Sequence, residues 1–562
     1  MRAASPLFLA LPVVLLAACG SSPTGSGPVE PLCSVPTPIA LNVGDYRIIN
    51  VSNETACIRL PGNSAASEYL LVAYAGNGTE SNNGSSASYA LQSDPTALTT
   101  AAALSELPSL AELPGTAPFV HGGADDFHQN LRTIEHRLAT SGAAQLLNAW
   151  AGPPAALTIP IFGDRDSFSV CKVVACNSFT RVGATVRYVG RAGVIYLDDQ
   201  LPAGADALTQ ADFDQLGTVF DDYLYPADTT AFGRESDING DGRVAILITD
   251  AVNDLTPDCS SGRVIGYFFG NDLLAGAPGS NRREVFYAFA PKPATASCSA
   301  VTRTRELTSL PPTLIHEFQH MISYNQHVLV RGGVDEDLWL NEGMSHFAEE
   351  LGFRVTPDAA CPAAPTCFSQ FAGGDLSNAY DYLNDPEATF LIAPRSGTGS
   401  LAERGAAWLF LRWAADHFSS DTLLGTSLTR ALEMTTVTGS ENIANATGQI
   451  FSNLVGEWQL ANYTENLPGF PQVGRLRYRT WDFRATFSRN SPAIFPKPYP
   501  LTPDSTSGAY SKSGTLRGGS GKFVRFKLPA GAAGETIRLA GSTVGTRVND
   551  AVLPRMAVVR IQ

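Results

Sequence analysis

The chain has 562 residues, of which 44% are hydrophobic and only 16% charged, against a charged share of about 25% in typical soluble proteins. This composition excludes a disordered chain and a coiled coil, and 51 glycines with 37 prolines argue against a largely helical protein. The formal net charge is −14 and the sequence carries no basic stripe, so nucleic acid is not an expected partner.

Residues 1–18 have the pattern of a bacterial signal peptide. Arg2 supplies the positive charge, and the apolar run from Leu7 to Leu16 is too short to span a bilayer. The run ends in Leu-Ala-Ala-Cys19, which resembles the lipobox of bacterial lipoproteins, and residues 19–32 form a flexible tether. We therefore expect export, lipidation of Cys19 and a lipid anchor at the outer membrane or cell surface. The alternative is an ordinary signal peptide that contains a cysteine.

Eight further cysteines fall into near-neighbour pairs, which is typical of disulfides formed in an oxidising compartment. No two of them have the CxxC spacing of a thiolate metal site, although free or metal-binding thiols remain the alternative. The predicted disulfides are Cys33–Cys57, Cys171–Cys176, Cys259–Cys298 and Cys361–Cys367.

Three regions follow the tether in the chain. Residues 33–120 comprise an N-terminal β-rich domain and a connector, with strands expected at 40–43, 46–51 and 69–74. Residues 121–468 form a mixed central domain that becomes mostly helical from 311, with helices expected at 124–148 and 209–224 and strands at 157–162, 184–188, 193–197, 244–248 and 284–290. Residues 469–562 are again β-rich, with strands at 523–528 and 536–539. This order predicts an α+β protein whose central domain is flanked by two small β-sandwich-like domains.

A short acidic loop precedes the strand at 244–248. Asp237, Asn239 and Asp241 have the spacing of the first half of a calcium loop, and Gly242 follows at the sharp turn. Ile248 stands where an EF-hand has its bidentate glutamate, so an EF-hand is excluded. A looser Ca²⁺ site and a plain Asx/Gly turn both remain open.

The most specific motif is His316-Glu317-x-x-His320. Pro311 and Pro312 suit the first turn of a helix. On that helix His316 and His320 lie one turn apart on the same face, so both imidazoles can bind one Zn²⁺. Glu317 is then placed to act as general base toward a zinc-activated water. The alternative is a surface helix with two incidental histidines.

A second helix, expected to begin near Leu340, supplies a third ligand. Glu342 follows the first helix and a glycine turn, and its carboxylate completes a His₂Glu set with one open position. Glu349 lies two turns further on nearly the same face, where it can accept the second ring N–H of a ligand histidine. The alternatives are an acid favoured by the helix dipole at Glu342 and a solvated charge at Glu349.

These motifs carry a family resemblance. HExxH followed by Trp339-Leu-Asn-Glu-Gly343 resembles the gluzincin metallopeptidases, although the gap between the motifs is longer than in the gluzincin aminopeptidases and their glycine-rich amine-binding motif is not evident. Residues 155–465 are more similar to the hyicolysin-like peptidases. The segments that carry this likeness, besides the two motif helices, are 163–168, 184–190, 194–198 and 405–413.

The resemblance implies a zincin metallopeptidase domain and endopeptidase action on a protein or peptide. It also implies an oxyanion donor downstream of the third ligand, for which Tyr380 and Tyr382 are favoured over His346 and His417. In zincins an edge strand pairs with the extended substrate, and residues 284–290 are a candidate for it. The alternative for that segment is a plain core strand.

Two other functions fit the same residues. One is a binding or adhesion lipoprotein that retains the zincin scaffold without turnover, which the intact Glu317 argues against. The other is a zinc-dependent hydrolase of a non-protein substrate, because HExxH does not fix the bond that is cleaved.

Overall fold

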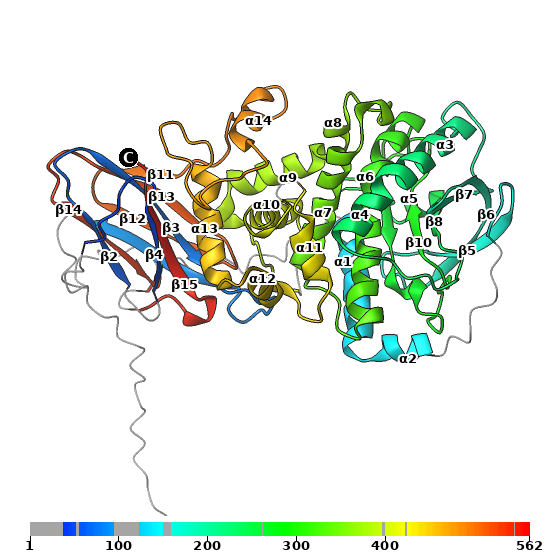
Figure 1. The fold of residues 1–562 in the computed structure, drawn as a ribbon, viewed down its shortest axis with the longest axis horizontal. Coiled ribbons are helices and arrows are strands. Elements are labelled where there is room, and N and C mark those ends of the chain that lie inside the picture. Colours follow the sequence, from blue (N-terminus) through cyan, green and yellow to red (C-terminus); the bar gives the residue numbers. More distant parts are fainter. Residues whose placement is uncertain are drawn as a thin grey trace, which may run out of the picture.

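The computed structural model describes residues 38–51, 56–94, 123–149, 159–260, 262–395, 399–421, 424–543 and 546–562. The predicted signal peptide, the tether and Cys19 lie outside these ranges. Figure 1 shows a β-sandwich at one end of the molecule, a helical middle and a mixed sheet at the other end. The protein is therefore α+β, as its sequence predicts.

The β-sandwich is built from both ends of the chain. Its first sheet has the order β1 (Tyr46–Asn50), β15 (Pro554–Arg560), β3 (Ser67–Ala75), β13 (Gly521–Leu528) and β11 (Asp504–Thr506). Its second sheet has the order β12 (Tyr510–Arg517), β4 (Ser86–Asp94), β14 (Gly534–Ala540) and β2 (Cys57–Pro61). The terminal β-rich segments, expected as two separate domains, thus interleave in one.

Strand β3, from the N-terminal part of the chain, depends on strands from the C-terminal part. Tyr69, Leu71 and Ala73 face the core between the two sheets, whereas Leu70 and Val72 belong to the larger core under the helices. An apolar strand with both faces covered lies inside a sheet, and β3 pairs antiparallel with β13 on one side and β15 on the other. Residues 40–43, which were expected to form a strand, are irregular and belong to neither sheet.

The mixed sheet has six strands. Their order is β5 (Arg165–Cys171), β6 (Phe179–Val189), β7 (Gly193–Asp198), β8 (Val244–Ile248), β10 (Val285–Ala288) and β9 (Gly266–Phe268). The candidate edge strand at 284–290 is instead interior, because β10 pairs parallel with β8 and antiparallel with β9. The edge is β9, whose three residues are too few to show a strand pattern in the sequence. The expected strand at 157–162 is irregular over its described residues, 159–162.

Helices cover this sheet and fill the middle of the molecule (Figure 1). Those before the metal motif are α1 (Gly123–Thr140), α2 (Ala143–Ala149), α3 (Gln210–Val219), α4 (Tyr225–Ala231) and α5 (Asp250–Asn253). The motif lies on α6 (Arg303–Tyr324) and α7 (Leu338–Val355), which pack against each other. The remainder are α8 (Cys367–Phe371), α9 (Gly373–Asn384), α10 (Leu401–Phe418), α11 (Thr426–Glu433), α12 (Gly439–Thr447), α13 (Phe451–Thr464) and α14 (Phe483–Arg489).

Helix α6 corrects the expected place of its prolines. Pro311 and Pro312 lie inside the helix rather than in its first turn. Proline lacks the N–H that would bond to the carbonyl four residues earlier. The two carbonyls freed in this way, of Leu307 and Thr308, each accept a hydrogen bond from the side-chain amide of Gln370 at 3.0 Å. The helix therefore continues through both prolines to the HExxH motif.

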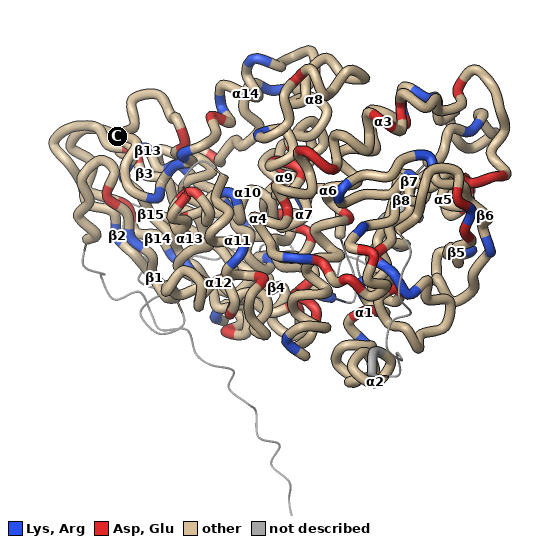
Figure 2. The backbone as a smooth tube through the Cα atoms, turned by 45° about the vertical axis from the view of Figure 1, so that its right-hand side comes forward, with Lys and Arg blue, Asp and Glu red and all other residues tan. Residues whose placement is uncertain are grey.

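Three of the predicted disulfides are confirmed: Cys171–Cys176, Cys259–Cys298 and Cys361–Cys367. Cys57 is also disulfide-bonded, while its expected partner Cys33 lies outside the described residues. Acidic and basic residues are interspersed along the backbone in Figure 2. Among the helices that the structure describes, none combines the length and apolar character needed to cross a bilayer.

Candidate metal centre

Helices α6 and α7 bring the three predicted ligands together. The Nε2 atoms of His316 and His320 lie 3.7 and 3.8 Å from the two carboxylate oxygens of Glu342. All three side chains are buried, and Oε2 of Glu342 has no hydrogen-bond partner among the described residues, although Nη1 of Arg404 lies 3.6 Å from it. Atoms at these separations each reach one ion at about 2.0–2.2 Å, and two imidazoles with one carboxylate are a zinc donor set. The residues present therefore fit Zn²⁺.

The other nitrogen of each ligand histidine is held by a neighbour on α7. Nδ1 of His316 lies 2.8 Å from Oε1 of Glu349, as expected from the sequence, and Nδ1 of His320 lies 2.8 Å from Oδ1 of Asn341. Nδ1–H donates in both contacts, which leaves the Nε2 lone pairs directed at the metal position. Burial lowers the pKa of both histidines and so favours the neutral, ligating form. The spacing of the motifs gives no sign of this role for Asn341, although it directly precedes Glu342.

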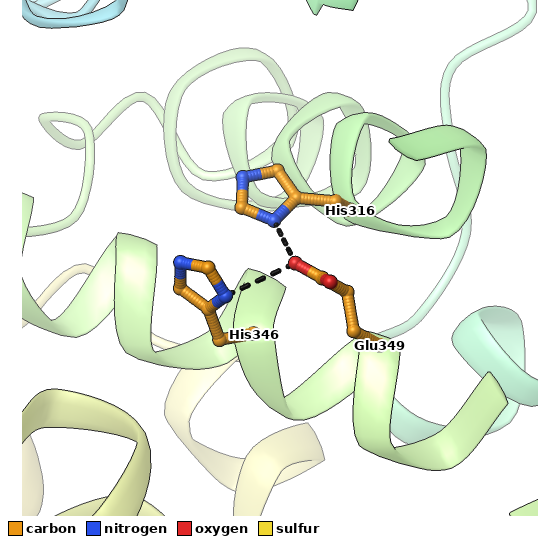
Figure 3. A group of neighbouring side chains, drawn as sticks. All are labelled: His316, His346 and Glu349. Carbon is orange, nitrogen blue, oxygen red and sulfur yellow. Dashed lines mark hydrogen bonds and ion pairs between the residues drawn. The ribbon is translucent and has the colours of Figure 1, made fainter. Parts of the chain in front are cut away.

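His316, His346 and Glu349 form a second cluster, drawn in Figure 3. Nδ1 of His346 lies 3.0 Å from Oε1 of Glu349 and 2.8 Å from Oδ1 of Asp375. A histidine nitrogen and a carboxylate oxygen that bind one tetrahedral zinc at about 2.0–2.1 Å would lie about 3.3 Å apart, so the shorter nitrogen–oxygen spacings here are those of hydrogen bonds. This cluster is a hydrogen-bonded hub and not a second metal site.

His346 is nevertheless placed beside the metal ligands. Its ring lies edge-on to that of His316, with 4.9 Å between the centroids, and in the described part of the chain nothing forms a hydrogen bond with its buried Nε2. In Figure 3 the Nε2 atoms of both rings lie on the side away from Glu349. Burial lowers the pKa of His346, but the carboxylates of Glu349 and Asp375 outweigh this and raise it to about 10.

Glu317 contacts the edge strand β9 and helix α1. Its Oε2 accepts a hydrogen bond from the backbone N–H of Phe268 at 2.8 Å, and its Oε1 lies 4.0 Å from Nδ1 of His128 on α1. Burial raises the pKa of Glu317 to about 8. The carbonyl of Phe268 accepts from Arg132 at 2.8 Å, so side chains already occupy both backbone groups of this residue.

The structure does not bring the other expected donors to the centre. The hydroxyl of Tyr380 accepts from the backbone N–H of Lys497, and the hydroxyl of Tyr382 accepts from the amide of Gln459. Both rings stack on aromatic neighbours away from the motif, and His417 is bonded to the carbonyl of Arg477. Of the four candidates, only His346 contacts a metal ligand in the described part of the chain.

The acidic loop at 237–242 bonds mainly to itself. Asp237 accepts from the N–H of Gly242 at 3.1 Å, Asp241 accepts from Arg243 at 2.8 Å, and the amide of Asn239 donates to Asp241 at 2.9 Å. The bond from the N–H of Arg243 to Asp241, two residues earlier, is that of an Asx turn. A calcium ion at Asp237, Asn239 and Asp241 remains a prediction from the sequence.

Comparison with known proteins adds a distant relative. No family model matches the chain. Over 176 residues it is 30% identical to the neutral metalloprotease ShpI of Staphylococcus hyicus, a match that covers 31% of this chain and 37% of that protein. The chain thus spans little more than a third of the relative's length. Together with the His₂Glu cluster, this match supports a relationship to the metalloproteases.

Proposed function

We propose that the protein is an exported zinc-dependent endopeptidase. The observation that carries this proposal is the convergence of His316, His320 and the carboxylate of Glu342, with Glu317 beside them. The similarity to a protein named neutral metalloprotease supports it. The signal-peptide pattern at residues 1–18 and the three disulfides support export, and lipidation at Cys19 is proposed on its sequence context alone.

Bound at the three ligands, Zn²⁺ would supply Lewis-acid chemistry that polarises the scissile carbonyl and lowers the pKa of water. Glu317 acts as general base: the N–H of Phe268 holds Oε2, and Oε1 is left to take the proton of the attacking water and return it to the leaving amine. Asn341 and Glu349 orient the two imidazoles.

Of the four candidate oxyanion donors, among which the sequence favours a tyrosine, we propose His346. Asp375 and Glu349 bind its Nδ1, so Nε2 is directed away from them and is free to donate to the oxyanion that develops at the carbonyl. Tyr380 and Tyr382 are not proposed for it, because their hydroxyls are engaged elsewhere.

The test is zinc content and casein cleavage in protein that lacks residues 1–19. Glu317→Gln keeps the shape of the side chain but not its basicity, so we expect one zinc per chain in both proteins and a loss of cleavage of about 10²–10⁴-fold in the variant. Glu306→Gln is the matched control. Glu306 is fully buried on the same helix, and burial raises its pKa well above the usual value, so a neutral amide replaces a neutral acid.

The outcomes separate the competing functions. Chelator-sensitive cleavage that is lost only in Glu317→Gln establishes the endopeptidase. Zinc in both proteins without cleavage of any protein or peptide favours the non-catalytic scaffold or a non-protein substrate. A folded protein without stoichiometric zinc refutes the site at His316, His320 and Glu342.

A further inference from the structure

The loop between β3 and β4 joins the β-sandwich to the helix that carries the third ligand. Glu80, on this loop, has only 8% of its side chain exposed. Its Oε1 accepts a hydrogen bond from the backbone N–H of Trp339 at 3.2 Å. Trp339 lies in the first turn of α7, on the same helix as Glu342. A carboxylate from the sandwich thus contacts the metal-binding helix at its N-terminus.

This contact supplies a cap that α7 does not supply for itself. The first N–H groups of a helix have no partner inside the helix, and a side chain at the preceding residue usually accepts from one of them. At α7 that residue is Asp337, and its side chain makes no such bond. Glu80, distant in sequence, takes this place, and although burial raises its pKa to about 7, its ionised form is favourable at the positive end of the helix.

A second residue holds the carboxylate of Glu80 in position. Nε of Arg395 lies 2.9 Å from Oε2 of Glu80, and the backbone N–H of Arg395 donates to the carbonyl of Glu80. The same guanidinium lies 3.7 Å from Asp335 and 4.0 Å from Asp337, just before α7. Arg395 therefore offsets the negative charge gathered at the start of the helix.

The sandwich is attached to the helices independently of Glu80. The hydroxyl of Tyr46 donates to Glu457 at 2.6 Å, and that of Tyr74 donates to the carbonyl of Ser452 at 2.8 Å. Glu80 instead lines one small hollow together with Glu342 and Arg404. Its contact is therefore local to the metal centre and is not what keeps the two parts of the molecule together.

We propose that Glu80 is a positioning residue of the metal centre. Its carboxylate fixes the first turn of α7 and, through it, the place of Glu342 relative to His316 and His320. This inference rests on the proposed function and adds to it a contribution from the β-sandwich.

The experiment uses protein that lacks only residues 1–19. Its zinc affinity is measured by competition with a chelator, a measurement that does not depend on turnover. Three variants distinguish the position of the side-chain oxygen of Glu80 from the negative charge that it carries. Glu80→Ala removes both, Glu80→Asp keeps the charge but withdraws the oxygen from Trp339, and Glu80→Gln keeps an oxygen at the same reach. Glu68→Ala is the control, because Glu68 on β3 pairs with Arg525 on the neighbouring strand β13 and is not part of the centre.

We expect the zinc Kd to rise about tenfold in Glu80→Ala and Glu80→Asp, the low end of the range for residues that support metal ligands. Glu80→Gln stays within about threefold of wild type, and Glu68→Ala is unchanged. In peptide cleavage, kcat falls in the first two variants while KM stays within about twofold.

Other results overturn the inference. Wild-type zinc affinity in folded Glu80→Asp refutes it, even if Glu80→Ala fails to fold. An equal loss of affinity in Glu68→Ala reduces the effect to general destabilisation. Wild-type protein that binds zinc but cleaves nothing contradicts the proposed function alone, whereas wild-type protein without zinc contradicts both.

Discussion

Two buried carboxylates, Asp272 and Glu350, show how the surroundings of a residue decide its charge. Asp272 accepts hydrogen bonds from Tyr287 and Asn281, but burial prevails and raises its pKa to about 7. Burial also acts on Glu350, yet the guanidinium groups of Arg354 and Arg412 hold the pKa of this residue below its usual value. Glu350 accepts from two tryptophan indoles as well and is a charged anchor of the helical core.

Asp272 makes the free energy of unfolding depend on pH. Because its pKa is higher in the folded than in the unfolded state, it stabilises the fold below about pH 4 and loses this contribution as the pH rises through about 7. Asp272→Asn cannot ionise. We expect the urea stability of wild type relative to this variant to fall by about 2–4 kcal/mol between pH 4 and pH 8. Parallel pH profiles for the two proteins would contradict the assignment.

At the scale of elements, α6 depends on a side chain from α8. Gln370 satisfies both carbonyls that Pro311 and Pro312 leave without a donor. Gln370→Ala should therefore cost about 2–4 kcal/mol, because each buried unpaired carbonyl costs about 1–3 kcal/mol. Gln215→Ala, which removes a single bond to the carbonyl of Ala360, should cost less.

A double-mutant cycle isolates the cause. Replacing both prolines by alanine restores two N–H groups for the carbonyls of Leu307 and Thr308, so Gln370→Ala in that background should cost at least 1 kcal/mol less than in wild type. Equal costs in both backgrounds, measured by urea denaturation, would show that Gln370 acts through packing instead.

The sequence predicts those parts of the centre that depend on helical periodicity. His316, His320, Glu342 and Glu349 can be predicted to lie together because one or two helical turns separate them on their helices, and the structure does bring their side chains together. The sequence does not show where the side chains of Tyr380 and Tyr382 point, because packing of these rings against Phe495 and Trp458 determines it.

Contacts between residues that are far apart in the sequence leave no such helical periodicity. Gln370 is distant from the prolines that it supports, and Glu80 is more distant still from Trp339. The edge strand β9 is too short to show an alternation of apolar and polar residues. Pairing between strands from the two ends of the chain leaves no local pattern either. The sequence therefore predicts two small β domains in place of the one sandwich.

At the scale of the whole molecule, the interleaved sandwich predicts that its N-terminal strands are not a removable pro-segment. A protease site inserted within residues 95–122 would cut the chain between β4 and α1. Because β3 lies between β13 and β15 and β4 lies between β12 and β14, the N-terminal piece should stay bound after cleavage.

Size-exclusion chromatography of the cleaved protein checks this. We expect one peak with the mass of the intact chain and with its zinc retained, and separation of the pieces only in denaturant. A free N-terminal piece beside an active remainder would show that the strands are dispensable. The uncut protein with the same insertion is the control.

The same pairing sets an order of events during synthesis. Leu70 pairs with Val559, so β3 has no partner on that side until nearly the whole polypeptide has emerged. Closing a loop of this length is slow compared with forming local helices. Glu80 follows β3 in the chain, so we expect its cap on α7 to be ordered only when β3 is held between β13 and β15. We therefore expect a chain that is truncated before β13 and β15 to bind zinc more weakly than the 562-residue chain.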